Sequence, residues 1–370
     1  MRAFLITSLL AVLLIAVSLA ADETGGSRLS TLLGSEEEEG FVKALEAREF
    51  EFPRDHGPHS DYRNEWWYVT GNLDDVNGRR FGFELTIFRF ALSPEAQESG
   101  WRSNQVYIAH LAVTDAEDER FLVAERFSRG ALGLAGARAE PFRVWIDDWH
   151  IGSDEASGPW RLVAADEEVS IDVELSPLKA PVLNGVDGLS QKSAEPGNAS
   201  YYYSITRLET EGTLRIGDES LAVSGLSWLD REWSSSALSA DQAGWDWFAL
   251  QLSDDSDLMF YNIRKNDGSQ DRHSSGTWVD SNGAVEHIDP QDIEIVVEDR
   301  WDSPAGGSYP SRWSLHLPGR DLRLTITPVI DDQELFTTVR YWEGAVDVDG
   351  ELSGRAIKGR GYVELTGYAE

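Results

Sequence analysis

The alternation of apolar and polar residues constrains the fold of this chain more than any other feature of its sequence. In the segment 79–90, Phe81, Phe83, Leu85 and Ile87 occupy every second position, which is the period of a β-strand with one buried face. Segments with the same pattern are 104–115, 142–151, 257–264, 321–329 and 361–368. Because such segments recur along almost the whole chain, the sequence predicts an all-β, antiparallel fold.

Turn signals separate the expected strands. The tripeptides at 76–78, 266–268, 281–283 and 348–350 end in Asn-Gly or Asp-Gly, the pair that favours the tight turn of a β-hairpin. Strands joined in this way form barrels or sandwiches rather than a doubly wound parallel sheet. We expect two β domains, residues 41–215 and 216–370, and a short helix at 41–50.

Residues 1–20 have the organisation of a secretory signal peptide. One positive charge precedes an apolar run that ends with the small residues Ser18 and Ala20, as signal peptidase requires. We expect cleavage after Ala20 and a periplasmic or secreted protein; an uncleaved membrane anchor is the alternative. Residues 21–40 are rich in Gly, Ser and Glu and are expected to be a flexible linker.

Composition excludes several kinds of site and partner. The chain has no cysteine, so it can form neither a disulfide nor a thiol nucleophile. Its formal net charge of −33 repels nucleic acid. After the first twenty residues no segment is long and apolar enough to span a membrane. His56 and His59 lack a third ligand nearby and no G-x-S-x-G motif is present, so we expect neither a metal nor a cofactor.

Acidic side chains among tryptophans form the candidate site. In the segment 227–233, Asp230 and Glu232 lie on one face of the expected strand, and Arg231 and Trp233 lie on the other. A carboxylate on an apolar face costs several kcal/mol unless it is paired with a cation or protonated. The expected catalytic acids are Asp230 and Asp246, and the expected ligand-binding residues are Glu65, Trp67, Arg231, Glu232, Trp233, Trp245, Trp247, Tyr341 and Trp342.

Three interpretations of these acids remain open. In the first, they form internal ion pairs, with Arg231 lying flat over a tryptophan and closing one barrel end. In the second, an apolar cavity keeps an acid neutral, so that it can protonate a substrate between aromatic faces. In the third, acids and tyrosines orient a mostly hydrophobic ligand without reacting with it.

Several longer motifs resemble the AttH and carotenoid 1,2-hydratase-like family. They are HSDYRNEWWYVTGNL at 59–73, WLDREWSSSALSADQAGWDWFALQL at 228–252, WDSPAGGSYPSRW at 301–313, DQEL at 332–335, YWEGAV at 341–346 and GYVELTGY at 361–368. The resemblance implies two tandem lipocalin-like (calycin) β-barrel domains and a ligand pocket at or between them. It also implies an arginine packed over a tryptophan at the closed end of a barrel, the position of Arg231.

The functions within this family differ. One branch adds water across an isoprenoid double bond, and fungal relatives are pericyclases that bind polyenes. Asp230 and Trp233 match the hydratase branch, whereas Arg231 and Glu232 stand where that branch has histidine and asparagine. An arginine stays charged and does not act as an acid or base, so the hydratase role does not carry over to Arg231. Secreted members are often encoded beside ABC-transporter components.

We therefore expect an exported lipocalin-like protein that binds a hydrophobic isoprenoid or acyl ligand, with ABC-transporter components as its protein partners. The alternative is a cofactor-independent hydratase, isomerase or cyclase acting on a polyene. The sequence leaves open whether the pocket lies inside one barrel or between the two.

Overall fold

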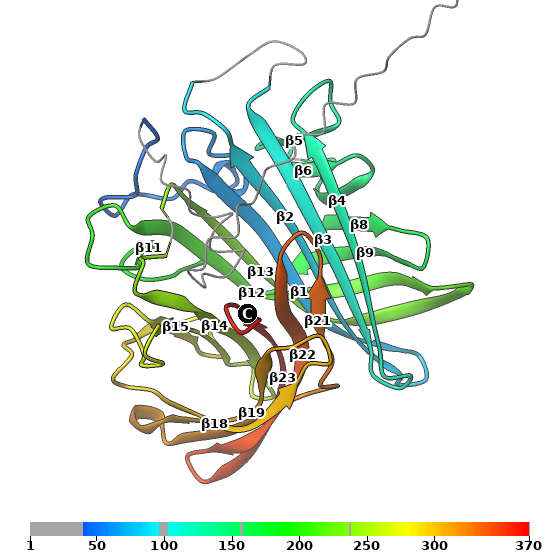
Figure 1. Cartoon of the computed structure of the whole chain (residues 1–370). Coiled ribbons are helices and arrows are strands. Elements are labelled where there is room, and N and C mark those ends of the chain that lie inside the picture. Colours follow the sequence, from blue (N-terminus) through cyan, green and yellow to red (C-terminus); the bar gives the residue numbers. More distant parts are fainter. Residues whose placement is uncertain (1–39, 96–102, 156–157, 237, 370) are drawn as a thin grey trace, which may run out of the picture.

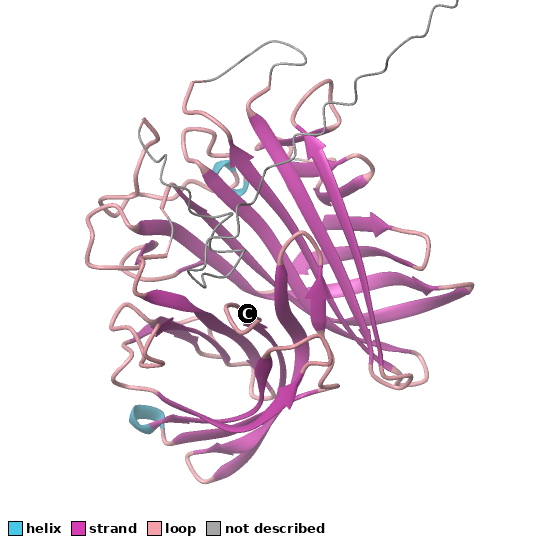
Figure 2. Cartoon of the chain, viewed as in Figure 1, coloured by secondary structure: helices cyan, strands magenta, loops and turns pink. Residues whose placement is uncertain are grey.

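The computed structural model describes residues 40–95, 103–155, 158–236 and 238–369. The predicted signal peptide and residues 21–39 of the predicted linker lie outside these ranges. Within them the chain is β throughout, apart from the 3-10 turns η1 (Arg54–His56) and η3 (Pro318–Arg320) (Figure 2). The all-β prediction is confirmed. Neither of these two described helices is long and apolar enough to cross a bilayer.

The first sheet is antiparallel and takes all its strands from residues 64–234. Its strands are β1 (Asn64–Asp75), β2 (Arg80–Ala91), β3 (Gln105–Asp115), β4 (Arg120–Arg129), β5 (Ala135–Arg138), β6 (Arg143–Ile146), β7 (Trp149–Gly152), β8 (Trp160–Ala165), β9 (Val169–Pro177), β10 (Val182–Leu183), β11 (Leu189–Gln191), β12 (Ala199–Ile216) and β13 (Glu219–Ser234). The order is β4-β3-β2-β1-β13-β12-β9-β8-β7-β6-β5, and β10 and β11 pair separately with β12 (Figure 1).

The second sheet is also antiparallel and follows the first in the chain. Its strands are β14 (Gln242–Leu252), β15 (Asp257–Lys265), β16 (Ser275–Val279), β17 (Val285–Ile288), β18 (Glu294–Asp302), β19 (Ser308–Leu317), β20 (Leu322–Pro328), β21 (Glu334–Phe336), β22 (Arg340–Leu352) and β23 (Arg355–Leu365). The order is β17-β16-β15-β14-β23-β22-β20-β19-β18, with β21 paired to β22. The two sheets are curled and barrel-like, as predicted (Figure 1).

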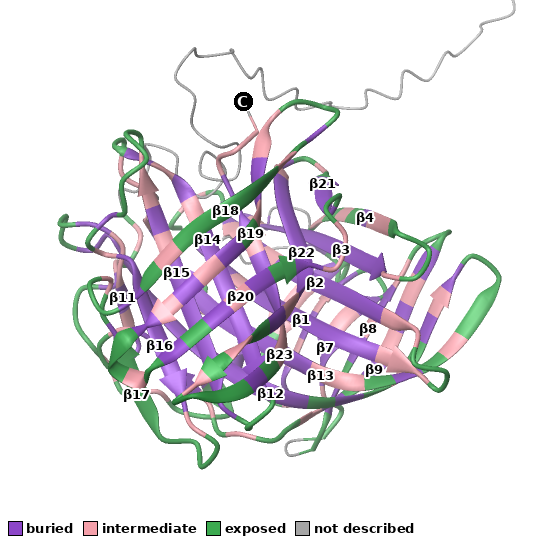
Figure 3. Ribbon diagram, turned by 90° about the horizontal axis from the view of Figure 1, so that it is seen from below, coloured by how far each residue is buried: buried purple, intermediate pink, exposed green. Residues whose placement is uncertain are grey.

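Sheet membership changes after β13. The predicted boundary between residues 215 and 216 falls at the end of β12, and β12 and β13 pair with each other as a hairpin of the first sheet. The chain passes to the second sheet between Ser234 and Gln242. The end of this long hairpin, residues 216–222, has several exposed residues (Figure 3).

Three of the four predicted hairpin turns are confirmed. Gly78, Gly268 and Gly283 have φ values of 86°, 80° and 83°, which glycine adopts without strain. The fourth prediction is wrong, because Gly350 lies inside β22. A β-carbon there would lie 2.0 Å from the carbonyl oxygen of Arg323, so this glycine serves close strand packing rather than a turn.

The helix expected at 41–50 is also absent, since this segment has no regular structure. Two of its apolar residues pack on the first barrel instead: Ala44 is buried in the core, and the ring of Phe50 lies 5.5 Å from that of Trp233. Tertiary contacts of these side chains therefore outweigh the local helical preference.

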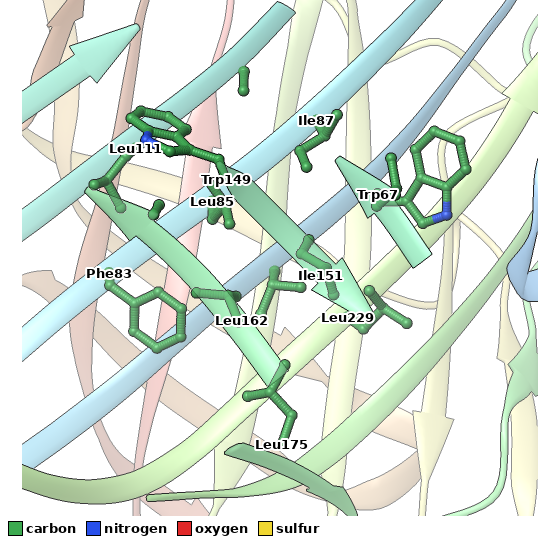
Figure 4. Packing of buried hydrophobic residues seen from close by; sticks show 14 of the residues in the cluster. Trp67, Phe83, Leu85, Ile87, Leu111, Trp149, Ile151, Leu162, Leu175 and Leu229 are labelled. Carbon is green, nitrogen blue, oxygen red and sulfur yellow. The ribbon is translucent and has the colours of Figure 1, made fainter. Parts of the chain in front are cut away.

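Each sheet encloses its own apolar core. Figure 4 shows part of the first, in which Trp67, Leu85 and Leu229 meet Trp149 and Leu162 from the far side of the barrel. The second core contains Phe248, Trp313 and Trp342 among its largest members. A third cluster lies where the sheets meet, and it includes Tyr68, Tyr202, Trp228, Trp247, Met259, Tyr261, Ala345 and Tyr362.

The two sheets approach each other closely at Gly82 of β2. A β-carbon on Gly82 would lie 2.5 Å from the β-carbon of Ala345 in β22, which is fully buried. We expect Gly82→Ala to lower the free energy of unfolding by about 1–3 kcal/mol, because the added methyl group overpacks this contact. Urea denaturation measures the effect.

The double variant Gly82→Ala with Ala345→Gly moves the methyl group from one sheet to the other. It should regain most of the lost stability. A double variant that is as unstable as Gly82→Ala alone would show that the contact between the sheets is not the cause.

Candidate functional site

A cavity of about 120 Å³ lies between the two sheets. The first sheet contributes Asn64, Trp66, Tyr68, Thr86, Phe88, Ser200, Tyr202, Asp230, Glu232 and Ser234; the second contributes Trp245, Trp247, Tyr261, Ile263, Tyr341, Glu343 and Glu364; Lys192, Ser236 and Leu238 complete the lining. The cavity therefore belongs to neither barrel alone. For comparison, an apolar cavity of about 150 Å³ suffices to bind benzene.

Asp230 faces this cavity and accepts three side-chain hydrogen bonds. Its Oδ1 accepts from Trp228 Nε1 at 2.7 Å and from Ser204 Oγ at 2.5 Å, and its Oδ2 accepts from the Tyr202 hydroxyl. Burial raises the pKa of Asp230 to about 7, against these three donors, which lower it. A carboxyl poised near neutral pH is able both to donate and to accept a proton.

Glu232, two residues further along β13, is held in a different environment. Lys192 Nζ lies 3.0 Å from its Oε1, to which Ser200 also donates a hydrogen bond. Burial by itself would lower the pKa of Lys192, but the Glu232 carboxylate raises it above its usual value. Lys192 also lies 4.1 Å from the ring centre of Tyr261. The result is an ion pair between Lys192 and Glu232 beside Asp230, whose carboxyl has a pKa of about 7.

Three further buried carboxyl groups come from β2, β22 and β23. Glu343 Oε1 accepts a hydrogen bond from the Tyr68 hydroxyl, and Glu84 accepts one from Thr86. Burial, and then repulsion from neighbouring carboxylates, raises the pKa of Glu343 and of Glu84 well above the usual range. Burial, together with repulsion from Asp230 and Glu232, raises the pKa of Glu364 to about 8. These carboxyls are therefore protonated at neutral pH, and Glu343 and Glu364 face the cavity.

Glu65, Arg231 and Trp67 lie on the other faces of β1 and β13, inside the first barrel. Glu65 forms ion pairs with both Arg89 and Arg231, and the Arg231 guanidinium lies 3.9 Å above the ring of Trp67. Burial would raise the pKa of Glu65, but the two arginines hold it well below its usual range. This is the arrangement of the internal ion-pair interpretation, and it stabilises the barrel end.

Three other predicted site residues also lie away from the cavity lining. Trp233 packs in the first core, where His59 stacks on it at 3.7 Å. Asp246 lies across β14 from Trp245 and Trp247, and its Oδ1 accepts from Arg264 Nε at 2.9 Å and from the Tyr368 hydroxyl at 3.0 Å. Trp342 is in the second core. The roles in ligand binding or catalysis that the sequence predicted for these three residues remain predictions, and their positions do not support them.

The comparisons with known proteins agree with this architecture. The model of the AttH-like family matches residues 43–368. The chain belongs to the AttH-like family. Among solved structures, a protein described as an AttH from Nitrosomonas europaea is 33% identical to this AttH-like chain, with a TM-score of 0.81, and the match covers 89% of this chain and 100% of that one. A comparison with curated proteins gave no match.

Two more distant structures share the fold of this AttH-like chain. Kievitone hydratase from Nectria haematococca is 16% identical, with a TM-score of 0.67, and the match covers 89% of this chain and 98% of that one. The protein CghA, solved with Sch210972, is 9% identical, with a TM-score of 0.53 and coverages of 90% and 97%. Among the described residues of this AttH-like chain, no group of three or more His, Asp or Glu residues could hold a metal ion.

Sequence reasoning did not single out several residues that line the cavity of this AttH-like protein. Glu343 and Glu364 are the clearest cases, each an acid flanked by apolar residues in a strand. The alternation argument used for Asp230 would have found them, because Glu343 shares a strand face with the predicted Tyr341. Lys192 could not be found in this way, since it lies in a loop and approaches the site only in the folded chain.

The pKa of Asp230 predicts how stability depends on pH. The pKa rises from 3.8 to about 7 on folding, so the folded state binds more protons between these values. The stabilisation is complete below the unfolded pKa and is lost as the pH rises through about 7. Relative to Asp230→Asn, the wild type should lose about 2–4 kcal/mol of unfolding free energy between about pH 4 and about pH 8.

Urea denaturation of both proteins across this pH range makes the measurement. Because the comparison is a difference between two otherwise identical chains, the carboxyls that do not interact with Asp230 cancel. If the difference in unfolding free energy between the wild type and Asp230→Asn does not change with pH, Asp230 titrates as an ordinary exposed acid.

Proposed function

We propose that this AttH-like protein is a cofactor-independent enzyme that binds a mostly hydrophobic small molecule between its two sheets and adds water to a carbon–carbon double bond, or removes it. The observation that carries the proposal is Asp230, a carboxyl with a pKa of about 7 that faces an aromatic cavity. A second acidic side chain, Glu232, forms an ion pair with Lys192 nearby. General acid–base catalysis requires one group that donates a proton and one that accepts it, and two acids in different environments can take these two roles.

The roles follow from these environments. Protonated Asp230 gives its proton to one alkene carbon, and positive charge develops on the other. The faces of Trp245, Trp247 and Tyr202, which line the cavity, stabilise this charge. Water then adds to the cationic carbon and loses a proton to the Glu232 carboxylate. Elimination of water follows the same steps in reverse. Glu232 then donates a proton to the leaving hydroxyl group, and Asp230 accepts a proton from carbon.

The fold comparison supports a reaction of this class. Kievitone hydratase, whose name gives its activity, has the same fold over 89% of this chain. At 16% identity this likeness extends to the fold alone, so the chemistry rests on the cavity residues.

Ligand binding without chemistry is the second candidate. The observation that favours it is the lining, in which Ile263 and Leu238 join eight aromatic rings: Trp66, Tyr68, Phe88, Tyr202, Trp245, Trp247, Tyr261 and Tyr341. An isoprenoid or acyl chain would fit such walls. A carrier would retain its guest unchanged, whereas the proposed enzyme would release a hydrated product.

The test uses a panel of isoprenoid, polyene and phenolic alkenes incubated with the protein in water labelled with oxygen-18. Mass spectrometry of the products should show one labelled oxygen added per double bond. The variant Ser236→Trp, which places a large ring in the cavity lining, should abolish both this conversion and binding. Binding of a panel member by the wild type with no labelled product would favour the carrier; neither binding nor product would overturn both candidates.

We also propose that the protein acts outside the cytoplasm, on the basis of the signal-like residues 1–20. N-terminal sequencing of protein expressed from its full gene should begin at Ala21. The ABC-transporter partner stays a prediction, and co-purification from solubilised membranes is its test.

A further inference from the structure

A series of neighbouring side chains connects the cavity to the surface of the protein. Glu125 in β4 is the outer member, with 27% of its side chain exposed. Its Oε1 lies 3.1 Å from His110 Nε2, and His110 Nδ1 lies 2.8 Å from the Tyr341 hydroxyl oxygen. Tyr341 lines the cavity. These three side chains therefore reach from solvent to the proposed reaction site.

The series combines both sheets and holds each member in place. His110, in β3, is 1% exposed, and the ring of Phe88 packs against it at 5.5 Å. Glu125 receives the backbone N–H of Thr338 at 2.9 Å and its hydroxyl at 3.0 Å. Burial raises the pKa of Glu125, but the hydrogen bonds from His110 and Thr338 outweigh it and lower this pKa. An ionised Glu125 favours the His110 tautomer with its proton on Nε2, in which Nδ1 accepts from Tyr341.

The inner end of the series meets a carboxyl group in which one of the two oxygens lacks a hydrogen-bond partner. Glu343 Oε2 is fully buried and has no hydrogen-bond partner among the described residues. Tyr341 and Glu343 lie on the same face of β22 and both line the cavity. Besides Glu343, the ionisable groups that act on Tyr341 are Glu84 and Glu364. A buried carboxyl with a free oxygen is stable only when it carries a proton, and Tyr341 links this one to solvent.

We propose that Glu125, His110 and Tyr341 form a proton relay between solvent and the cavity carboxyl Glu343. In the outward direction, Glu343 gives its proton to the Tyr341 oxygen, the Tyr341 hydroxyl proton moves to His110 Nδ1, and the Nε2 proton moves to Glu125. One proton leaves Glu343, one arrives at Glu125, and no bond between heavy atoms changes. The reverse steps reload Glu343 from solvent.

The relay rests on the proposed function for its purpose, because hydration or dehydration moves protons into and out of the cavity. The cavity acids are electrostatically linked: Asp230 and Glu232 raise the pKa of Glu364, and Glu364 in turn raises that of Glu343. Protonation of Glu343 therefore affects the charge that surrounds Asp230. The two proposals still fail separately, since the relay is measured without any substrate.

Time-resolved infrared spectroscopy after a jump from alkaline to acidic pH tests the relay, with the proton itself as the probe. The carbonyl band that disappears in Glu343→Gln identifies protonated Glu343. In His110→Phe this band should grow more slowly than in the wild type by about tenfold or more, while its final amplitude is unchanged. Glu125→Gln, which changes a partly exposed residue and should fold normally, should slow the band in the same direction.

Two controls separate a relay from a structural role. His287→Phe removes a half-exposed histidine far from the series and should leave the rate unchanged. The Asp230 band, identified with Asp230→Asn, should keep its rate in His110→Phe, because Asp230 lies at the Lys192 end of the cavity. An unchanged Glu343 rate in both His110→Phe and Glu125→Gln, a change in final amplitude alone, or the absence of any Glu343 band would each overturn the proposal.

Discussion

Replacing Glu65 by alanine should lower the free energy of unfolding by about 3–5 kcal/mol, because it leaves two buried arginines without their counter-ion. Arg89 and Arg231 are 1% and 0% exposed and both pair with Glu65. Neither guanidinium can lose its charge to escape the cost of burial. Urea denaturation of the purified variant measures the effect.

An exposed ion pair in the same barrel provides the control. Asp172 pairs with Arg161 at 2.5 Å, with side chains that are 46% and 63% exposed. Solvent screens such a pair, so Asp172→Ala should cost no more than about 1 kcal/mol. If Glu65→Ala and Asp172→Ala have equal effects, the stability of the first barrel does not depend on its buried ion pairs.

The second large effect is expected at the proposed acid. On the alkene that the wild type hydrates fastest, Asp230→Asn should reduce kcat by about 10²–10⁴-fold, since an amide cannot donate the proton that general acid catalysis needs. The amide keeps the size of the carboxyl, so KM should change little. The product formed in oxygen-18 water is the measurement.

Asp246→Asn is the matched control for this substitution. Both acids were predicted from the same alternation argument, but Asp246 pairs with Arg264 on the far face of β14. We expect its substitution to affect stability and to leave kcat within about threefold of the wild type. A loss of turnover in Asp246→Asn together with full turnover in Asp230→Asn would exchange the two roles and refute the assignment.

The alternation of residues predicted the two faces of the strands correctly. It placed Asp230 opposite Arg231 in β13, and Asp246 opposite Trp245 and Trp247 in β14, as the structure does. It did not tell which face of each strand meets the cavity. Both faces of these strands are apolar and buried, one in a barrel core and one between the sheets, so the choice depends on how two distant halves of the chain dock.

The same limit explains what else the sequence did not reveal. Lys192 approaches Glu232 across 40 residues, and His110 approaches Tyr341 across 231, and no local pattern encodes either contact. The helix prediction for segment 41–50 failed for the opposite reason. Its local pattern is helical, but Ala44 and Phe50 pack into the first barrel instead. Local signals determined the elements of this fold, and long-range packing determined its site.

The two faces of β13 make the chain sensitive to a type of mutation that leaves composition almost unchanged. Arg231 enters the barrel and Asp230 and Glu232 enter the cavity, in strict alternation. Inserting or deleting one residue within this strand would send the guanidinium toward the aromatic pocket and the carboxyls into the barrel core. We therefore expect relatives that keep both the barrel arginine and the cavity carboxyls to differ in the length of the β12–β13 turn. The number of residues in β13 between that turn and Ser234 should stay the same.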